Sequence, residues 1–259
     1  MTWLEALLLG VVQGLTEFLP VSSSGHLELG RALLGGPVEQ GLPFTIAVHG
    51  ATVLAVVSVF WGDIRRLARG LLARGPNPEK TYVLKLLLSM IPMLLVGLFL
   101  REEVERFFTG NLKAVGIFFF VTAAFLAAAH FRRPRDRDIS YGDALLMGAA
   151  QAVAVLPGIS RSGAVISSGM LAGARRDELA RFAFLMSVAP IAGANLIEAA
   201  GGGFAEATLA AGPLAVGFLA AFLTGFVACR VMIALVRRGR LVGFSLYCAA
   251  AGVFSFVLS

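Results

Sequence analysis

Charged residues are scarce in this chain of 259 residues. Asp, Glu, Lys and Arg together make up 15% of it, while hydrophobic residues make up 58%. Soluble domains carry roughly 25% charged residues, so this composition, with a mean hydropathy of +0.82, excludes an ordinary soluble domain. We therefore predict a protein that crosses a membrane several times.

Cysteine is also scarce, and its placement excludes a disulfide framework or a cysteine-based metal site. The two cysteines, Cys229 and Cys248, lie within apolar runs and lack the spacing of a metal or redox motif. We expect both to pack in the interior. The N-terminus lacks the basic segment of a cleavable signal peptide and carries Glu5 instead, so we expect the first helix to be retained.

The excess of basic residues does not indicate a nucleic-acid partner. The net charge is +6 and the pI is near 10.0, but Lys and Arg occur in the short connections between apolar runs. Basic connections are the signal that orients membrane proteins. We therefore expect membrane lipids, and no nucleic acid, around this chain.

Long apolar runs account for most of the sequence. A helix that spans a bilayer needs about 20 predominantly apolar residues, and six stretches approach this length. They are 43–61, 82–100, 112–131, 179–199, 213–236 and 241–258. Four shorter apolar pieces form two pairs, within 4–34 and 142–174, each interrupted by Pro, Gly and Ser. The predicted fold is therefore all-α and integral to the membrane, one domain over 1–259 with six transmembrane helices and two re-entrant helical hairpins.

The two hairpins are copies of one another at a constant offset of 138 residues. The identical pairs are Ala6 and Ala144, Leu7 and Leu145, Leu8 and Leu146, Gly10 and Gly148, Gln13 and Gln151, Ser22 and Ser160, Ser24 and Ser162, and Gly25 and Gly163. The basic connections orient the first hairpin from outside and the second from the cytoplasm. We therefore predict an inverted repeat, approximately 1–131 and 141–259, with both termini outside and the site at the junction of the hairpins.

The first hairpin carries the sequence QGLTEFLPVSSSGH at 13–26. It places a carboxylate, an imidazole and three hydroxyls in an apolar run, and ionisable residues within membrane segments mark functional sites. Gln13 and Glu17 share one helix face, and a proline then ends that helix. We expect Ser22–Ser24 to cap a second helix that starts near Gly25 and binds an anion through its free N–H groups.

The second hairpin carries PGISRSG at 157–163, in which Arg161 stands where the first copy has Ser23. The guanidinium is a planar fork of donors that suits phosphate. We therefore predict a site for a phosphate ester or diphosphate whose lipid tail enters sideways from the bilayer. The catalytic candidates are Glu17, Ser23, His26 and Arg161. The phosphate-binding candidates are Gln13, Ser22, Ser24, Gly25, Ser160, Ser162 and Gly163.

The catalytic candidates divide the work of phosphoryl transfer between them. Ser23, or a water in its place, would attack phosphorus while His26 moves the proton. Glu17 would act as a base, orient His26, or bind a divalent cation such as Mg²⁺ or Ca²⁺. One carboxylate is few ligands for such a metal, so phosphate oxygens would have to complete the site. We expect no organic cofactor.

Both motifs resemble those of the undecaprenyl-diphosphate phosphatase family, the bacitracin-resistance proteins. The EGLTEFLPVSSTGH-type motif of that family appears here as QGLTEFLPVSSSGH, and its PGTSRSG-type motif as PGISRSG. The resemblance implies hydrolysis of undecaprenyl diphosphate to the monophosphate and phosphate, which recycles the lipid carrier of peptidoglycan synthesis. It also implies a bacterial inner-membrane protein whose active site opens toward the periplasm.

The resemblance assigns functional positions residue by residue, with three departures. The acidic-or-Gln pair of the family corresponds to Gln13 and Glu17, and its serine pair corresponds to Ser22 and Ser23. Its histidine corresponds to His26 and its arginine to Arg161. Ser24 stands where Thr is common, and His49 lies in a span where the family often has Gln. Gln13 in place of Glu leaves one carboxylate fewer, which weakens the case for tight metal binding.

One other function competes with this interpretation, and a second phosphatase pattern can be excluded. A lipid-phosphate transporter or flippase fits the same architecture, because transporters also use inverted repeats with broken helices. The type 2 acid phosphatase pattern is excluded, because it needs a histidine shortly after the second Ser-Arg and 162–176 contains none. The patterns Gly10-x-x-x-Gly14 and Gly169-x-x-x-Gly173 indicate helix packing, with a homodimer as the alternative.

Overall fold

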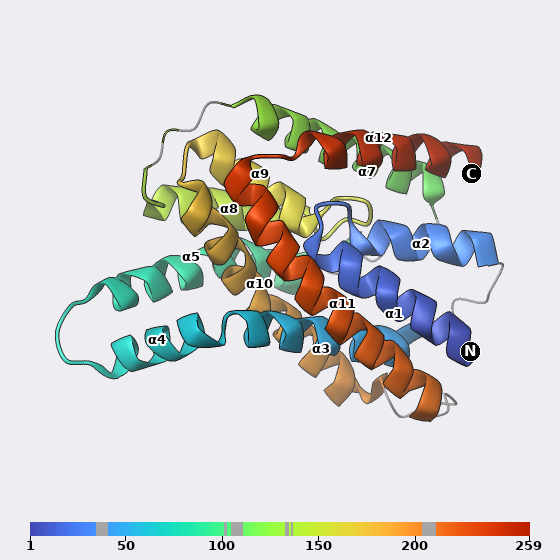
Figure 1. Cartoon of the computed structure of the whole chain (residues 1–259), viewed down its shortest axis with the longest axis horizontal. Coiled ribbons are helices and arrows are strands. Elements are labelled where there is room, and N and C mark those ends of the chain that lie inside the picture. Colours follow the sequence, from blue (N-terminus) through green and yellow to red (C-terminus); the bar gives the residue numbers. More distant parts are fainter. Residues whose placement is uncertain (35–40, 101–102, 105–110, 133–134, 136, 204–210) are drawn as a thin grey trace.

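The computed structural model describes the chain except for residues 35–40, 101–102, 105–110, 133–134, 136 and 204–210. Every element of the described part is a helix (Figure 1). The elements are α1 Trp3–Phe18, α2 Ser23–Leu34, α3 Gly41–Val59, α4 Trp61–Leu72, α5 Pro78–Phe99, α7 Leu112–Phe131, α8 Tyr141–Val153, α9 Arg161–Ala172, α10 Arg176–Glu198, the π-helical turn η3 Ala199–Gly203, α11 Ala211–Arg238 and α12 Val242–Val257. The predicted all-α fold is confirmed.

Helices occur at all six predicted spans, but they are not equally long. Among the described residues, α5, α7, α10 and α11 are long and apolar enough to cross a membrane, and α3 joins them if it is counted together with α4, from which it bends by 73°. The last helix, α12, has 16 residues and is shorter than the predicted stretch. These apolar helices make a multi-pass membrane protein.

One helix was not predicted from the sequence. The basic connection that follows α3 begins with α4, whose apolar residues share one face and whose Arg65, Arg66 and Arg69 interrupt the hydrophobic run. A search for long uninterrupted apolar runs therefore misses α4, because this helix is amphipathic rather than apolar throughout. The helix ends before Ala73, where the backbone becomes extended.

The first hairpin consists of α1 and α2. A capping box between Thr2 and Glu5 starts α1, and the helix ends just before Pro20, which cannot donate a helical hydrogen bond. Ser22 then takes the left-handed conformation, with φ of 68°, which is rare for a residue with a side chain. The chain thus turns sharply, and α2 begins at Ser23, two residues earlier than expected.

The second hairpin, α8 and α9, repeats the local hydrogen bonds of the first. The Ser160 hydroxyl accepts from the Gly163 amide at 3.1 Å and lies 3.3 Å from the Ser162 hydroxyl. At the equivalent positions, the Ser22 hydroxyl accepts from the Gly25 amide at 3.3 Å and lies 3.4 Å from the Ser24 hydroxyl. The identical Ser-x-Ser-Gly sequences therefore build the same turn in both copies.

Each hairpin packs against a long helix from the other half of the chain. A side chain at Gly10 would collide with the Gly217 carbonyl on α11, and one at Gly148 would collide with the Ser89 carbonyl on α5. Gly14 lies equally close to Thr224 of α11. Small residues let helix backbones approach in this way, so the first Gly-x-x-x-Gly face is used within the chain rather than presented to a second copy.

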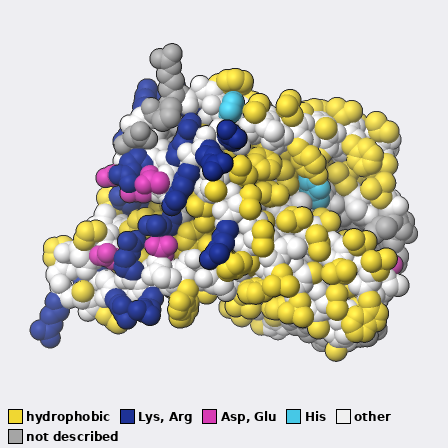
Figure 2. Space-filling model, in the orientation of Figure 1, with side chains coloured by type: hydrophobic (Ala, Val, Ile, Leu, Met, Phe, Trp, Pro, Cys, Tyr) yellow, Lys and Arg dark blue, Asp and Glu magenta, His cyan; other side chains and the backbone are white. Residues whose placement is uncertain are grey.

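The turns of the two hairpins lie together in the middle of the molecule (Figure 1). The Gly158 amide donates to the Ser22 hydroxyl at 3.1 Å, and the Ser162 hydroxyl donates to the Leu19 carbonyl at 3.2 Å. Both termini lie at one end of the molecule in Figure 1. Lys and Arg side chains gather toward the opposite end on the face seen in Figure 2.

Candidate active site

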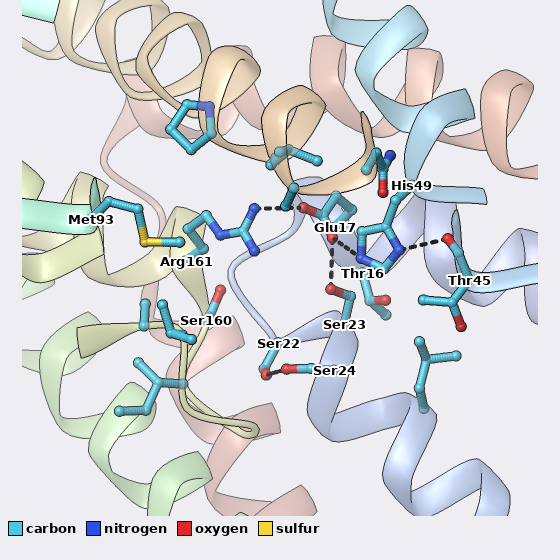
Figure 3. Close-up of a pocket in the computed structure, with 18 of the residues that line it drawn as sticks. Thr16, Glu17, Ser22, Ser23, Ser24, Thr45, His49, Met93, Ser160 and Arg161 are labelled. Carbon is cyan, nitrogen blue, oxygen red and sulfur yellow. Dashed lines mark hydrogen bonds and ion pairs between the residues drawn. The ribbon is translucent and has the colours of Figure 1, made fainter. Parts of the chain in front are cut away.

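A cavity of about 330 Å³ lies where the two hairpin turns meet α3 and α10 (Figure 3). Its polar wall comes from the end of α1, the start of α2 and the start of α9. Apolar side chains such as Leu27, Met93 and Ile191 complete the lining. The cavity therefore combines polar and apolar side chains in one lining, as the binding site of a lipid with a charged headgroup requires.

Glu17 is the polar centre of this cavity. Its side chain is only 6% exposed, and one carboxylate oxygen, Oε2, accepts from the Ser23 hydroxyl at 2.7 Å and from the Gln13 amide at 3.1 Å. A buried charge needs such partners, because an unpaired carboxylate away from water is costly. The predicted shared face of Gln13 and Glu17 is confirmed by this contact.

Arg161 approaches the same carboxylate from the second hairpin. Its NH1 atom lies 3.6 Å from Glu17 Oε1, and its buried Nε atom has no hydrogen-bond partner within the protein. Arg161 lines the cavity and its side chain is 27% exposed, so the guanidinium can reach a ligand there (Figure 3). The prediction that the two hairpins bring Arg161 and Glu17 together is confirmed.

The three consecutive serines have different environments. Ser23 donates to Glu17, as described above. The Ser22 hydroxyl already accepts from two amides, those of Gly25 and Gly158, and contacts Ser24. Ser22 thus holds the two turns together, and Ser23 is the member of the trio whose hydroxyl hydrogen-bonds to a carboxylate.

The predicted phosphate-binding set is only partly gathered at the cavity. Ser22, Ser24 and Ser160 line it. The amides of Gly25 and Gly163 donate to the caps Ser22 and Ser160 instead of facing the cavity. Gln13 is buried against Glu17, and Ser162 is bonded to the Leu19 carbonyl. These last four residues support the turns, because the capping hydroxyls have taken the donors expected for an anion.

His26 lies outside the cavity, contrary to the expectation that it stands beside Glu17. Its Nδ1 atom is 2.7 Å from the Ser22 carbonyl, and its Nε2 atom is 2.6 Å from the Tyr247 hydroxyl. The ring stacks on Tyr247 and meets the edge of Phe119. Leu27 and Glu28 form the cavity face of α2, whereas His26 is turned toward α7 and α12.

His49 occupies the position expected of His26. It projects from α3 into the cavity (Figure 3), with Nε2 at 4.0 Å from Glu17 Oε2. The sequence offered one signal, a lone histidine in an apolar span. Asn195 and Glu198 of α10 also line the cavity.

The residues present do not form a protein metal site. Among the described residues, no three His, Cys, Asp or Glu side chains gather closely enough to hold a metal ion. Oε2 of Glu17, the predicted ligand, accepts from Ser23 and Gln13, and Oε1 faces the Arg161 cation. A guanidinium at this distance competes with a metal for the same carboxylate.

Comparison with known proteins places the chain in a family. The family model described as bacitracin resistance protein BacA matches residues 6–254. A Parabacteroides distasonis protein named undecaprenyl-diphosphatase is 48% identical over 257 residues, covering 98% of this chain and 97% of that protein. A protein of the same name from Bacteroides fragilis is 46% identical over 263 residues, covering 100% and 99%, and one from the archaeon Methanosphaera stadtmanae is 36% identical over 274 residues, covering 99% and 98%. The chain therefore belongs to the BacA family of bacitracin resistance proteins.

Proposed function

We propose that this protein is an undecaprenyl-diphosphatase, which hydrolyses the lipid diphosphate to the monophosphate and inorganic phosphate. Full-length relatives at 46–48% identity carry that name. The observation that carries the proposal is the single cavity in which Ser23, Glu17 and Arg161 meet beside apolar walls. Recycling of the lipid carrier by this reaction sustains cell-wall synthesis and accounts for resistance to bacitracin.

The chemistry follows from the partners of each group. Ser23 attacks the terminal phosphorus as its proton passes to Glu17 Oε2, 2.7 Å away. The new bond joins Ser23 Oγ to phosphorus, and the bridging P–O bond breaks with its electron pair on the departing monophosphate. Arg161 neutralises charge on the phosphate oxygens in the transition state. Water then hydrolyses the phosphoserine and releases inorganic phosphate.

A divalent cation has a different place in this proposal from the one expected of Glu17. Mg²⁺ and Ca²⁺ bind oxygen ligands, and Mg²⁺ in particular is often held largely by substrate phosphates. A cation that arrived with the diphosphate would be held by phosphate oxygens and would add to the charge supplied by Arg161. The protein's own residues bind and orient the headgroup and move its protons.

In the proposed membrane arrangement, six helices span the bilayer and two hairpins re-enter it, in inverted repeats over approximately 1–131 and 141–259. The turns of the two hairpins have the same hydrogen bonds, and each hairpin packs on a helix from the other half of the chain, α1 on α11 and α8 on α5. Both features support this arrangement. The gathering of Lys and Arg at one end (Figure 2) supports a cytoplasmic face there. Both termini then lie outside the bacterial inner membrane.

The cavity opens toward the outer face in this arrangement. Its lining extends from Arg161 at the turn to Thr45 near the start of α3 and Glu198 at the end of α10. These two helix ends lie away from the end where Lys and Arg gather in Figures 1 and 2. A headgroup presented on the periplasmic side would reach Ser23 without crossing the bilayer.

Purified protein in detergent separates hydrolysis from transport. No two sides exist in detergent, so a transporter would leave a polyprenyl diphosphate intact, whereas a phosphatase releases inorganic phosphate. We expect phosphate release with Michaelis kinetics, measured by a colorimetric phosphate assay with a soluble-tail analogue as substrate. Intact substrate after prolonged incubation would favour the flippase.

His26 is expected to position the Ser22 turn rather than to transfer a proton. Asparagine can place an N–H where the His26 Nδ1 atom meets the Ser22 carbonyl, but it cannot carry a proton at neutral pH. We expect His26→Asn to retain phosphate release within about 10-fold of the wild type, and His26→Ala to lose more, because it leaves that carbonyl without its partner. If both variants were equally inactive, His26 would instead have the proton-transfer role predicted from the sequence.

A further inference from the structure

We propose that His49 is a catalytic residue of this site, the group that receives from Glu17 the proton taken from the nucleophile. The proposal rests on the function above and assigns a role to a residue that neither motif contains. His49 lies on α3, one turn beyond Thr45, and both residues line the cavity. Its side chain is 21% exposed, so the ring is open to the cavity on one side.

The backbone of α3 fixes which ring nitrogen faces the reaction. Nδ1 of His49 lies 2.9 Å from the Thr45 carbonyl, and a carbonyl oxygen can only accept. The neutral ring therefore carries its hydrogen on Nδ1 and keeps a lone pair on Nε2. That lone pair faces Glu17, as Figure 3 shows.

The same carboxylate oxygen lies between the serine hydroxyl and the imidazole. Glu17 Oε2 is 2.7 Å from Ser23 Oγ and 4.0 Å from His49 Nε2. The longer distance is not a hydrogen bond, but catalytic contacts are often long without substrate and tighten when it binds. A small rotation of either side chain would complete a path from Ser23 through Glu17 to His49.

Each step of this path balances in protons. The Ser23 O–H bond breaks and the proton passes to Glu17 Oε2 as Ser23 Oγ bonds to phosphorus. The proton then moves to His49 Nε2, which regenerates the Glu17 carboxylate and leaves an imidazolium facing the phosphates. In the second step Glu17 takes a proton from the attacking water and gives it to Ser23 Oγ as the bond from Ser23 Oγ to phosphorus breaks, and His49 returns its proton to the departing phosphate.

Charged side chains from four other helices line the cavity around His49. From the other elements around the cavity, the described charged side chains in its lining are Glu17 of α1, Glu28 of α2, Arg161 of α9 and Glu198 of α10. Histidine is the side chain whose ordinary charge change falls between about pH 5 and 8. His49 is the one histidine among the described lining residues, because His26 faces Tyr247.

Phosphate release as a function of pH tests this role. Glutamine keeps a donor and acceptor of similar reach at position 49 but cannot carry the proton. We expect His49→Gln to lower kcat about 10- to 100-fold, with little change in KM, and to remove the limb of the kcat profile between about pH 5 and 8. The matched control is His130→Gln, which replaces a histidine bonded to the Gly239 carbonyl away from the cavity, and which should keep wild-type kinetics.

Two results would overturn the proposal. One is His49→Gln with the wild-type kcat, and the other is a lowered kcat with the wild-type pH limb intact, since a purely structural histidine would leave that limb in place. Absence of phosphate release by the wild type would instead defeat the proposed function. The activity assay therefore distinguishes the two failures.

Nitrogen-15 NMR of histidine-labelled wild-type protein provides a readout that does not depend on turnover. The resonances of His49 are those absent from His49→Gln, or those that remain when His26 and His130 are assigned. We expect the neutral ring to carry its proton on Nδ1, and the Nε2 resonance to shift when methylenediphosphonate is added. A neutral ring protonated on Nε2 could not accept the proton from Glu17, and it would rule out the relay.

Discussion

Replacement of Ser23 by alanine is expected to lower kcat for phosphate release by roughly 10⁴- to 10⁶-fold, as for loss of one member of a serine nucleophile and the groups that activate it. The reason is geometric, because the Ser23 hydroxyl donates to the Glu17 carboxylate at 2.7 Å. KM should change little, since the hydroxyl takes part in the chemistry more than in binding the headgroup. The measurement is steady-state phosphate release together with a search for phosphoserine by mass spectrometry after rapid quench.

Ser24→Ala is the matched control for this prediction. Ser24 is the next residue, lines the same cavity and loses the same atoms, but its hydroxyl contacts Ser22 rather than a carboxylate. Its loss should lower the rate less than about 10-fold, in keeping with the modest net worth of one neutral hydrogen bond. Comparable rates for the two variants would show that water, not Ser23, attacks phosphorus.

Arg161→Lys is expected to lower kcat/KM by about 100- to 1,000-fold, although it keeps the positive charge. Lysine is a point charge and cannot offer two parallel donors to phosphate oxygens. In addition, Arg161 lines the cavity 3.6 Å from Glu17 and its side chain is 27% exposed, so its donors are accessible to the substrate. Phosphate release measured over a range of substrate concentrations separates the effects on kcat and KM.

Arg181→Lys provides the comparison for that variant. Arg181 lies in α10 and pairs with Asp63 at 3.4 Å, a partly exposed ion pair outside the cavity lining, so the conservative exchange should leave kcat/KM within about 2-fold of the wild type. If Arg161→Lys also kept full activity, a guanidinium would not be needed at that position, and the role proposed for Arg161 would be wrong.

Several parts of the fold could be predicted because local rules decide them. Pro20 ends α1 wherever the chain goes next, and the serines of Ser22–Ser24 and Ser160–Ser162 cap a following helix through contacts within three residues. The apolar runs locate helices by length. The amphipathic α4 escaped this rule because its basic residues break the run, although its apolar residues still cover one face.

The free amides at the helix starts were predicted less well. The expectation was that N–H groups such as that of Gly25 would face an anion, but Ser22 and Ser160 accept the hydrogen bonds of Gly25 and Gly163. A capping residue satisfies the donors that an anion would otherwise use. The sequence contains both the cap and the donors, and it does not show which partner the donors take.

The sequence by itself determined which chemical groups reach the middle of the molecule, because a carboxylate and a guanidinium in apolar runs are retained only where they have partners. Glu17 and Arg161 were accordingly predicted to meet, and they do. Only the tertiary structure decided which histidine joins them. The rotation of α2 about its axis is set by packing against Phe119 and against Tyr247, which is 221 residues away along the chain, and this packing turns His26 out of the cavity. His49 enters the cavity from α3 instead, because contacts between distant helices, and not the local sequence, fix the face that each helix presents.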